Sequence, residues 1–432
     1  MRRLALLLAV AAASCSAPPG GDSFAWSVAL SDLDVAMRAV CGEGDHIIAV
    51  GGRNRGTVYE WTGDAWIAAP LPSGTERLWW CWVDATGAGF AVGERGTIVS
   101  RAATGAWQPV DDTAGAIPDN VTLYGVWGAS PTDVTVVGGG FNPGDERTYV
   151  VHYDGETWTR ADTASFPDEA LFKVWGTGGD DIWVVGTGGA ILHYDGDAWT
   201  VHTSPVTDRL IAVWGTASDD VYAVGGDGLG AVLHYDGAAW SQIASTPERL
   251  SGVWAGDGRY VYVAGDRGYL ARIDTSDPTR IESRLPLANV DMHSIIGIGG
   301  AIVACGADLL SGGDPSWRGA VVAHGADLSG DVIGLPDAGP GPDASIVDAG
   351  PADASPYPGP GELCGTPPNL CRPGIFCWGL LTSDAYICTD VCNTASECFE
   401  YGPDACCAVP GFQTLEKVCI PAGYAECNST PR

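Results

Sequence analysis

The sequence has few positive charges. Lys and Arg together number 22 against 53 Asp and Glu, so the net charge is −31 at pH 7, and only two of the basic residues are lysines, Lys173 and Lys417. Nucleic acids and anionic membrane surfaces carry dense negative charge and would repel such a chain. The composition therefore argues against nucleic acid as a partner, and the charge helps to keep the chain soluble.

Long apolar stretches are also missing. The run from Leu4 to Ala13 follows Arg2 and Arg3 and holds ten residues, whereas a membrane-spanning helix needs ~20. A charged start, a short apolar stretch and small residues before a cleavage site are typical of a secretory signal. We therefore expect residues 1–15 to be a signal peptide.

The signal ends in Ala12-Ala13-Ser14-Cys15, which resembles the lipobox of bacterial lipoproteins, although the family usually has Leu where Ala12 stands. The resemblance implies that Cys15 becomes the lipidated first residue. The expected location is the cell envelope, as an outer-membrane lipoprotein or at the cell surface, with the lipid as the membrane contact. The alternative is ordinary cleavage, which would leave the protein secreted.

Familiar catalytic motifs are absent. The sequence contains no His-Glu-x-x-His zinc motif, no Gly-x-Ser-x-Gly elbow and no P-loop. We therefore predict no catalytic residues, no metal and no cofactor, and a binding or scaffold function. The competing hypothesis is a carbohydrate-active hydrolase or lyase, which as a hydrolase would need two carboxylates ~5–9.5 Å apart in a pocket.

Glycine and tryptophan are abundant, with 61 and 17 residues, and they recur in a repeat. One copy reads Val174-Trp175-Gly176, then Asp181 to Gly186, then His193-Tyr194-Asp195-Gly196 and Trp199. Seven copies begin at Cys41, Trp82, Trp127, Trp175, Trp214, Trp254 and Ile295. A repeat of ~40 residues with several β-forming runs and Asp-Gly hairpin signals is typical of a four-stranded propeller blade.

We therefore predict an all-β, seven-bladed β-propeller over residues 22–335. The fourth strand of a copy begins at a tryptophan, namely Trp66, Trp107, Trp158, Trp199 or Trp240. The sixth copy has Arg280 near that place, and the seventh ends after its third strand, Ala320 to His324. The segment Phe24 to Val28 resembles the fourth strand Asp197 to Val201, so we expect it to complete the last blade and close the ring.

The repeat resembles those of secreted bacterial propeller proteins and is distantly similar to Asp-box and kelch repeats. An Asp-box has one residue between Asp and Gly, whereas Asp195-Gly196 and Asp236-Gly237 are adjacent here. Sialidase activity is therefore not implied. WD40 repeats share the architecture without these motifs.

The C-terminal part changes composition. Residues 336–361 are rich in Pro, Asp, Ala and Gly and predict an extended linker. Residues 362–432 hold ten cysteines, which predict five disulfides: Cys364, Cys371, Cys377, Cys388, Cys392, Cys398, Cys406, Cys407, Cys419 and Cys427. Zinc is disfavoured because there is no Cys-x-x-Cys pair and no histidine after His324.

The cysteine spacing resembles small modules of the Dickkopf or EB type. The functional interpretation is a binding or protease-resistant tip, and the alternative is a stable terminus without a ligand. Within the propeller, Cys41 and Cys81 could form a bridge between adjacent blades, since neighbouring strand positions point to opposite faces. Cys305 could instead pair with Cys41, and a cysteine left over would be a buried thiol.

Two other patterns concern binding. His152, His193 and His234 recur at one repeat position, so we expect a strand feature and no shared metal. Asp133, Asp181 and Asp220 recur before the second strand, where we expect bonds to turn backbone; the alternative is Ca²⁺.

Five blades have an arginine in the loop between the second and third strands: Arg55, Arg95, Arg147, Arg267 and Arg318, the last beside Trp317. Together they predict a cationic face for a protein or an anionic polysaccharide. The alternative is local pairing with Glu94, Glu146 and Asp266.

Overall fold

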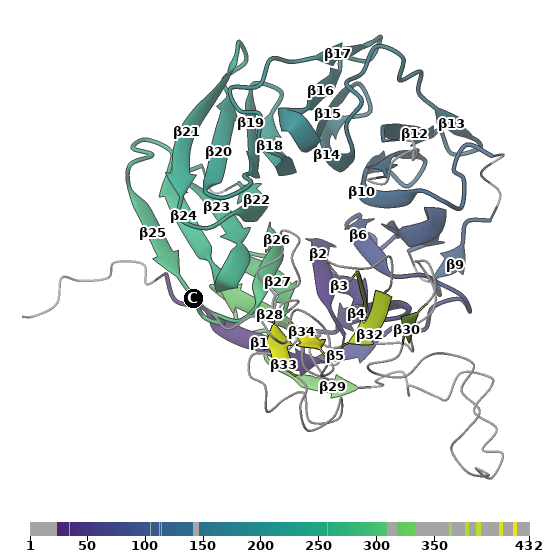
Figure 1. Ribbon diagram of the computed structural model, residues 1–432. Coiled ribbons are helices and arrows are strands. Elements are labelled where there is room, and N and C mark those ends of the chain that lie inside the picture. The colour runs from purple at the N-terminus through teal and green to yellow at the C-terminus, as the bar shows by residue number, and fades with distance from the viewer. Residues whose placement is uncertain are drawn as a thin grey trace, which may run out of the picture. The chain divides into compact units, whose positions relative to one another are not determined.

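The computed structural model describes residues 24–333, with gaps at 34, 104, 112, 114, 141–146, 257 and 309–317, and the backbone of five short strands nearer the C-terminus. The chain divides into two compact units, residues 1–337 and 338–432. In the first unit, sheets stand around a common axis as seven blades (Figure 1). The predicted all-β, seven-bladed propeller is confirmed. In the described part of the chain, no helix is long and apolar enough to cross a membrane.

In the first three blades, the strands follow chain order from the axis to the rim. Blade one has β2 (Met37–Glu43), β3 (His46–Gly52), β4 (Gly56–Trp61) and β5 (Ala65–Ala68); blade two has β6 (Leu78–Val83), β7 (Gly89–Gly93), η1 (Glu94–Gly96), β8 (Ile98–Arg101) and β9 (Gln108–Pro109); blade three has β10 (Thr122–Ser130), β11 (Asp133–Gly139), β12 (Tyr149–Tyr153) and β13 (Trp158–Arg160).

The other four blades repeat this order, except at the rim of the last. Blade four has β14 (Leu171–Gly178), β15 (Asp181–Gly186), η2 (Thr187–Gly189), β16 (Ile191–Tyr194) and β17 (Trp199–Val201); blade five has β18 (Leu210–Ala217), β19 (Asp220–Gly225), β20 (Gly230–Tyr235) and β21 (Trp240–Thr246); blade six has β22 (Leu250–Ala255), β23 (Tyr260–Gly265), η3 (Asp266–Gly268), β24 (Leu270–Asp274) and β25 (Ile281–Arg284); blade seven has β26 (Asp291–Ile298), β27 (Ala301–Ala307), β28 (Gly319–His324) and β1 (Ser27–Leu33).

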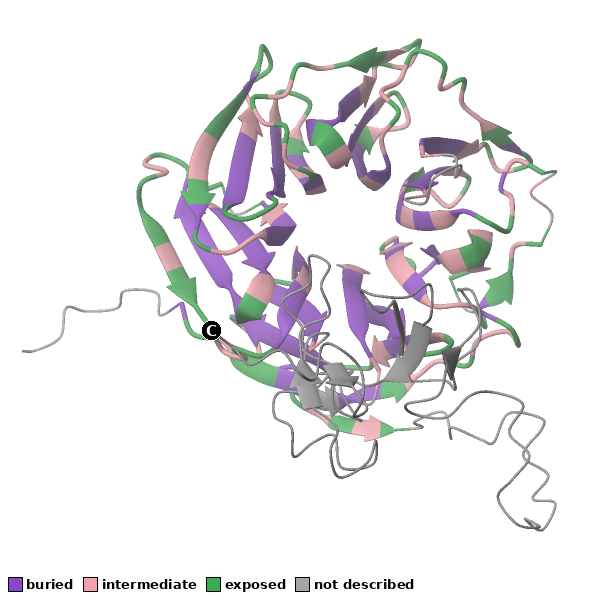
Figure 2. Cartoon of the chain, viewed as in Figure 1, coloured by how far each residue is buried: buried purple, intermediate pink, exposed green. Residues whose placement is uncertain are grey.

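Burial is highest in the second strands and falls toward the rim. Residues 221–225 of β19 are all buried, as their run of β-forming residues predicts for a strand covered on both faces. By contrast, β25 has three exposed residues and one of intermediate exposure. Figure 2 shows the same gradient around the ring, with buried residues on the inner strands and exposed ones outside. Each blade thus buries its faces against its neighbours.

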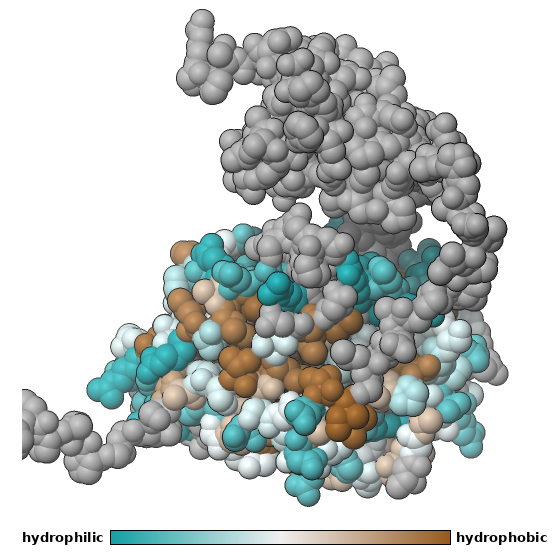
Figure 3. Space-filling model, turned by 90° about the horizontal axis from the view of Figure 1, so that it is seen from below, coloured by the Kyte–Doolittle hydropathy of each residue, from teal (hydrophilic) through white to brown (hydrophobic). Residues whose placement is uncertain are grey.

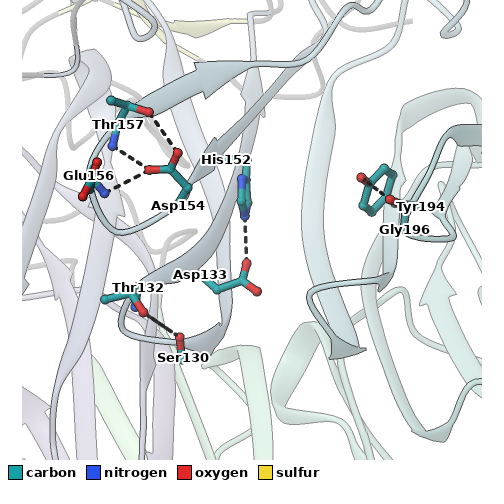
Figure 4. A network of polar contacts seen from close by, with 9 residues as sticks. All are labelled: Ser130, Thr132, Asp133, His152, Asp154, Glu156, Thr157, Tyr194 and Gly196. Atoms are coloured by element: carbon teal, nitrogen blue, oxygen red, sulfur yellow. Dashed lines mark hydrogen bonds and ion pairs between the residues drawn. The ribbon is translucent and has the colours of Figure 1, made fainter.

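The Asp-Gly pairs form the hairpins between third and fourth strands. In blade three, the Asp154 carboxylate accepts hydrogen bonds from the backbone N–H groups of Glu156 (2.9 Å) and Thr157 (2.7 Å) (Figure 4). These bonds hold the pKa of Asp154 below its ordinary value. Gly155 has φ of 92°, a conformation that disfavours a side chain. The pair therefore works as a turn, as the sequence predicts.

The Trp-Gly pair of the first strand joins neighbouring blades. A Cβ atom on Gly215 of blade five would lie 2.5 Å from the Trp175 ring of blade four, and one on Gly176 would lie 2.9 Å from the Trp127 ring of blade three. The ring of one blade thus lies against the glycine of the next, where no larger residue fits. The same contact joins Trp82 to Gly128 and Trp254 to Gly297.

Blade one lacks this tryptophan. Cys41 stands in its place and forms a disulfide with Cys81 of blade two, with Cα atoms 5.9 Å apart. Blade two in turn has Val83 where the other blades mostly have glycine. A covalent bond therefore joins these two innermost strands, between which the Trp-Gly contact is missing. Cys305 is a buried free thiol.

The seventh copy is offset by one residue from the sequence prediction. Ile296 pairs with Val303 as Trp254 pairs with Tyr262, so Ile296, and not Ile295, occupies the tryptophan position. The cause is the turn between the first two strands, which is one residue shorter in blade seven than in blade six.

The N-terminal strand closes the ring. β1 pairs antiparallel with β28, with Ser27 opposite Ala323 and Val28 opposite Val322, as predicted. The strand begins at Ser27, however, and not at Phe24, which is fully buried before it. At the inner end of this junction, the Ser294 hydroxyl bonds the backbone N–H (3.3 Å) and carbonyl (3.2 Å) of Val40 in blade one.

The rim of blade one has a strand that the sequence analysis missed. β29 (Asp331–Ile333) pairs in parallel with β5, and the Trp66 indole donates to the Leu328 carbonyl at 3.1 Å. Ile67 and Ile333 are exposed in these two strands. Figure 3 views the molecule from the side on which β1 and β29 lie in Figure 1, and hydrophobic residues collect there.

The second unit contains two small sheets. One has the strand order β30 (Leu363–Cys364), β32 (Tyr386–Thr389) and β31 (Phe376–Gly379), and the other pairs β33 (Cys406–Ala408) with β34 (Val418–Ile420). The side chains of this unit, including its ten cysteines, lie outside the described residues, so the predicted disulfides stay a prediction.

The Trp-Gly contact can be tested with Gly215→Ala. We expect the variant to lose about 1–3 kcal/mol of unfolding free energy, because the new methyl group meets the packed Trp175 ring. Urea unfolding followed by tryptophan fluorescence measures this. Gly228→Ala is the control, because a Cβ there meets no atom within 4 Å. If the two variants were equally stable, the claim that the Trp175 ring fills the space beside Gly215 would be wrong.

The inter-blade disulfide can be tested with the double variant Cys41→Ala/Cys81→Ala. The bond closes a loop of 40 residues, and its loss should cost about 4 kcal/mol in the chain-entropy model. The measurement is the urea midpoint under non-reducing conditions. Cys305→Ala is the comparison, because it removes a buried sulfur that forms no bond. A double variant as stable as the parent would show that the bond does not support the ring.

Candidate functional site

The predicted cationic loops lie at the end of the blades where second strands finish. Arg95 and Arg267 occupy the middle of η1 and η3 with φ of 54° and 53°, a left-handed conformation that is unusual for arginine. Arg55 and Arg318 are exposed and Arg147 is half-buried. Trp317 lies outside the described residues.

Glutamates pair with Arg95, Arg147 and Arg267. Each partner is a glutamate two residues before a first strand: Arg95 with Glu76 at 3.6 Å, Arg147 with Glu169 at 3.5 Å, and Arg267 with Glu248 at 2.6 Å. The local-pairing interpretation expected other partners. Glu94 and Asp266 instead bond Arg77 and Arg249, both at 2.9 Å, and Glu146 lies outside the described residues. Local pairs thus neutralise part of the charge on this face.

The repeated histidines bond within their own blades. Each donates a hydrogen bond from Nε2 to the carboxylate of the aspartate that begins the neighbouring strand: His152 to Asp133 (2.8 Å, Figure 4), His193 to Asp181 (2.7 Å) and His234 to Asp220 (2.8 Å). We expected these aspartates to bond turn backbone, and the structure shows a histidine partner instead, because second and third strands are adjacent. Among the described residues, no group of three His, Cys, Asp or Glu side chains could hold a metal ion.

The first strands enclose a cavity of about 490 Å³ on the propeller axis. Five tryptophans line it: Trp80, Trp82, Trp127, Trp175 and Trp214. Most other lining residues are valine, isoleucine, alanine or glycine, and the charged ones among the described residues are Glu43 and Lys173. Gly44, Ala129 and Gly299 also line it; they lie at the turns that leave the first strands, opposite the arginine loops. The cavity is therefore apolar and aromatic, and its lining extends to that end of the blades; we call the opposite end, at Lys173, the inner end.

A β-bulge interrupts every first strand three residues before the tryptophan position. The bulged residues are Arg38, Trp79, Tyr124, Phe172, Ile211, Ser251 and His293. We call these seven residues the bulge ring. Several contact one another around the axis: the Arg38 guanidinium lies 3.9 Å from the Trp79 ring centroid, and the Tyr124 ring is 5.3 Å from Trp79 and 5.5 Å from Phe172.

Lys173 connects the bulge ring to the cavity. It follows Phe172 and lines the cavity, yet it is only 8% exposed. Its Nζ donates to the Tyr124 carbonyl at 2.9 Å and lies 4.0 Å from the Trp80 ring centroid. Among the described residues, Lys173 has no carboxylate partner. Burial lowers its pKa from 10.5 to about 7, since desolvation disfavours the charged form.

Three donors of the bulge ring have no partner. Arg38 is 7% exposed, and its Nε is buried without a hydrogen bond, as are Nε2 of His293 and Nε1 of Trp79. Burial, and then the positive charges of Arg38 and Lys173, lower the pKa of His293 to about 3. Burial and Arg77 lower the pKa of Arg38 to about 10. His293 is therefore neutral at pH 7, while Arg38 stays charged.

Sequence analysis did not find this site. The members of the bulge ring share no residue type, so no composition pattern marks them. Their position in the repeat could have identified them, because each lies three residues before the tryptophan position of its copy, which Cys41 and Ile296 occupy in blades one and seven. Cys15, the predicted lipidation site, lies outside the described residues.

No protein-family model matches the chain, and no curated protein matches it. Solved structures do. The β-propeller domain of Myceliophteria thermophila Cps50 (Swd1) is 13% identical over 69% of this chain and 99% of that chain, with a TM-score of 0.52. The WD40 β-propeller domain of Doa1 is 10% identical over 71% and 99%, with a TM-score of 0.53. YCF48 bound to D1 peptide is 15% identical over 51% and 71%, with a TM-score of 0.41. The first two likenesses show the β-propeller fold.

The buried amine can be tested with Lys173→Met, which keeps the apolar stem. Folding lowers the pKa of Lys173 from 10.5 to about 7. Below pH 7 the lysine is charged in both states, so burial of the charge lowers the unfolding free energy by its full amount. This loss of stability disappears as the pH rises to 10.5. The variant should therefore exceed the parent in stability below pH 7. Its advantage should shrink by about 1.4 kcal/mol per pH unit above that. Urea unfolding of both chains at several pH values measures the difference, and an advantage independent of pH would contradict the assignment.

Proposed function

We propose that this chain is an exported binding protein that holds a protein partner by seating an apolar or aromatic segment in the central cavity. The observation that carries the proposal is the lining of the cavity, with its five tryptophans and few charged groups. Ligand sites in proteins are typically concave, mostly apolar and supplied with a few polar groups. Lys173, at the inner end, provides such a group.

The cavity suits a peptide side chain better than a sugar. Sugars present many hydroxyl groups, and each must find a partner when it leaves water. The lining offers few polar side chains, chiefly Glu43, Thr177 and Lys173. An apolar side chain gains about 25 cal/mol for each Å² removed from water, so it fits this wall without unsatisfied groups. This supports a protein partner over a polysaccharide.

The lining also favours binding over hydrolysis. The common glycosidase mechanisms use two carboxylates that flank the scissile bond. Of the described residues that line the cavity, Glu43 is the one carboxylate. The second candidate function, a carbohydrate-active enzyme on this scaffold, therefore lacks support at this site.

Export and lipid anchoring are part of the proposal. They rest on the signal-like N-terminus and on Cys15. The disulfide between Cys41 and Cys81 agrees with an oxidising compartment such as the periplasm or the cell surface. In this proposal, the lipid fixes the chain to the envelope, and the propeller presents its cavity to the partner.

The test is a random-peptide display library selected on the mature chain. We expect enrichment of peptides with a shared apolar or aromatic residue. Ala129→Trp should weaken their binding at least about tenfold, because Ala129 lines the cavity and is exposed, so a large ring there blocks the cavity without disturbing the core.

Ala238→Trp is the matched control, because Ala238 is equally exposed in a hairpin of blade five outside the cavity lining. Binding by Ala238→Trp should equal that of the parent. Selected peptides that bind both variants equally would place the binding surface elsewhere and overturn the proposal.

A further inference from the structure

We propose that the inner end of the cavity is a carboxylate site, in which Lys173 and Arg38 bind the anionic group of the ligand whose apolar part fills the cavity. This inference rests on the proposed function and deepens it by naming the chemical class of the ligand, an apolar carboxylic acid such as an acidic or C-terminal peptide residue.

The first argument is the placement of charge. The chain has 22 basic residues against 53 acidic ones, so carboxylates to pair with are plentiful. Yet Lys173 and Arg38, both more than nine-tenths buried, form no direct ion pair with a carboxylate among the described residues; the Glu94 carboxylate, which bonds Arg77, attracts Arg38 without contacting it. Burying a cation without a counter-ion is costly. A ligand anion would remove that cost.

The second argument is the set of unsatisfied donors. Arg38 Nε, His293 Nε2 and Trp79 Nε1 are buried without hydrogen-bond partners. Most buried polar groups in proteins are hydrogen-bonded, so such a group needs an explanation. Neutral His293 can donate through Nε2 in one tautomer, and the indole N–H is a donor only. These donors suit a ligand group with several hydrogen-bond acceptors, such as a carboxylate.

The third argument is convergence. Arg38 belongs to blade one, Lys173 to blade four and His293 to blade seven, and the first two are near enough to His293 to lower its pKa. Contacts also connect the two cations: the Arg38 guanidinium lies 3.9 Å from the Trp79 ring centroid, that ring lies 5.3 Å from the Tyr124 ring, and the Tyr124 carbonyl accepts the hydrogen bond of Lys173 Nζ. Lys173 itself lines the cavity. The unsatisfied donors belong to the bulge ring that adjoins it, so donors from several blades gather next to the cavity.

The charge favours a carboxylate over a phosphate. The site offers one permanent cation, Arg38, and one amine that charges when an anion arrives, Lys173. A carboxylate needs only one of these two positive charges, and its planar shape matches the fork of a guanidinium. A phosphate dianion would need both groups fully charged, which the burial of Lys173 opposes.

The experiment compares two probes that differ in one group. N-acetyl-tryptophan and N-acetyl-tryptophanamide share the indole, and only the first has a carboxylate. Calorimetric titration of the full mature chain at pH 7 should show the acid binding at least about tenfold more tightly, as charge-assisted hydrogen bonds predict. Equal affinities would overturn the carboxylate site while leaving the proposed function intact. Binding of neither probe would also overturn it, and the peptide selection would then decide the proposed function.

Two variants show which residues cause the preference for the acid over the amide. In Lys173→Met, the acid-to-amide affinity ratio should fall clearly below that of the parent, with Arg38 left as the one cation of the site. In Arg95→Gln, a change in an exposed loop arginine, the ratio should stay that of the parent. A ratio lost in Arg95→Gln and kept in Lys173→Met would move the anion site to the arginine loops and contradict the inference.

The lysines give a second readout. Only Lys173 and Lys417 are present, so a ¹³C-lysine-labelled chain should give two ε-carbon signals, and Lys173→Met identifies one of them. Saturating N-acetyl-tryptophan should raise the pKa of Lys173 and leave that of Lys417 unchanged. An unchanged Lys173 titration would contradict direct contact with the carboxylate.

Discussion

The propeller depends on one contact, the tryptophan ring of an innermost strand lying against the glycine of the next blade. At Gly215 against Trp175 the ring lies where a Cβ atom would stand, so in most blades two residue types at one spacing determine how closely the blades approach. Blade six has Ala255 at the glycine position, and the Trp214 indole donates a hydrogen bond to its carbonyl instead. Blade one lacks the tryptophan, and the disulfide between Cys41 and Cys81 joins that pair of strands. Blades seven and one are joined by the bond between Ser294 and Val40 and by the chain itself, because β1 pairs with β28 at the rim of blade seven and then continues into β2 of blade one.

The same contact determines the chemistry of the axis. Tryptophans that pack between blades also line the central cavity, so its wall is aromatic as a consequence of how the ring is built. The bulged residues form a second set of side chains around the axis, and their residue types do not follow the repeat. They are of seven different kinds, and three of their donors stay unsatisfied. A repeated scaffold thus carries one non-repeated set of side chains, which is where a specific ligand can be distinguished.

The repeat made the fold predictable, because each copy contains the sequence signals of its own strands and turns. The Asp-Gly hairpins, the rim tryptophans and the closing N-terminal strand all followed from local patterns. The place of Ile296 could not be predicted in this way, because the seventh copy is degenerate and its sequence does not show that one turn is a residue shorter. β29 was missed because its pairing is with a strand far away in sequence, at Trp66. The candidate site was missed because bulge residues such as Arg38 and His293 share a position and no chemistry.

The central claim is that the axis of the propeller, and not its arginine loops, is the binding site. A crystal structure of the mature chain with N-acetyl-tryptophan tests it most directly. The account predicts the indole within the tryptophan-lined cavity and the carboxylate within hydrogen-bonding distance of Lys173 Nζ and the Arg38 guanidinium. Density for the probe among Arg55, Arg95 and Arg267, with an empty cavity, would contradict it.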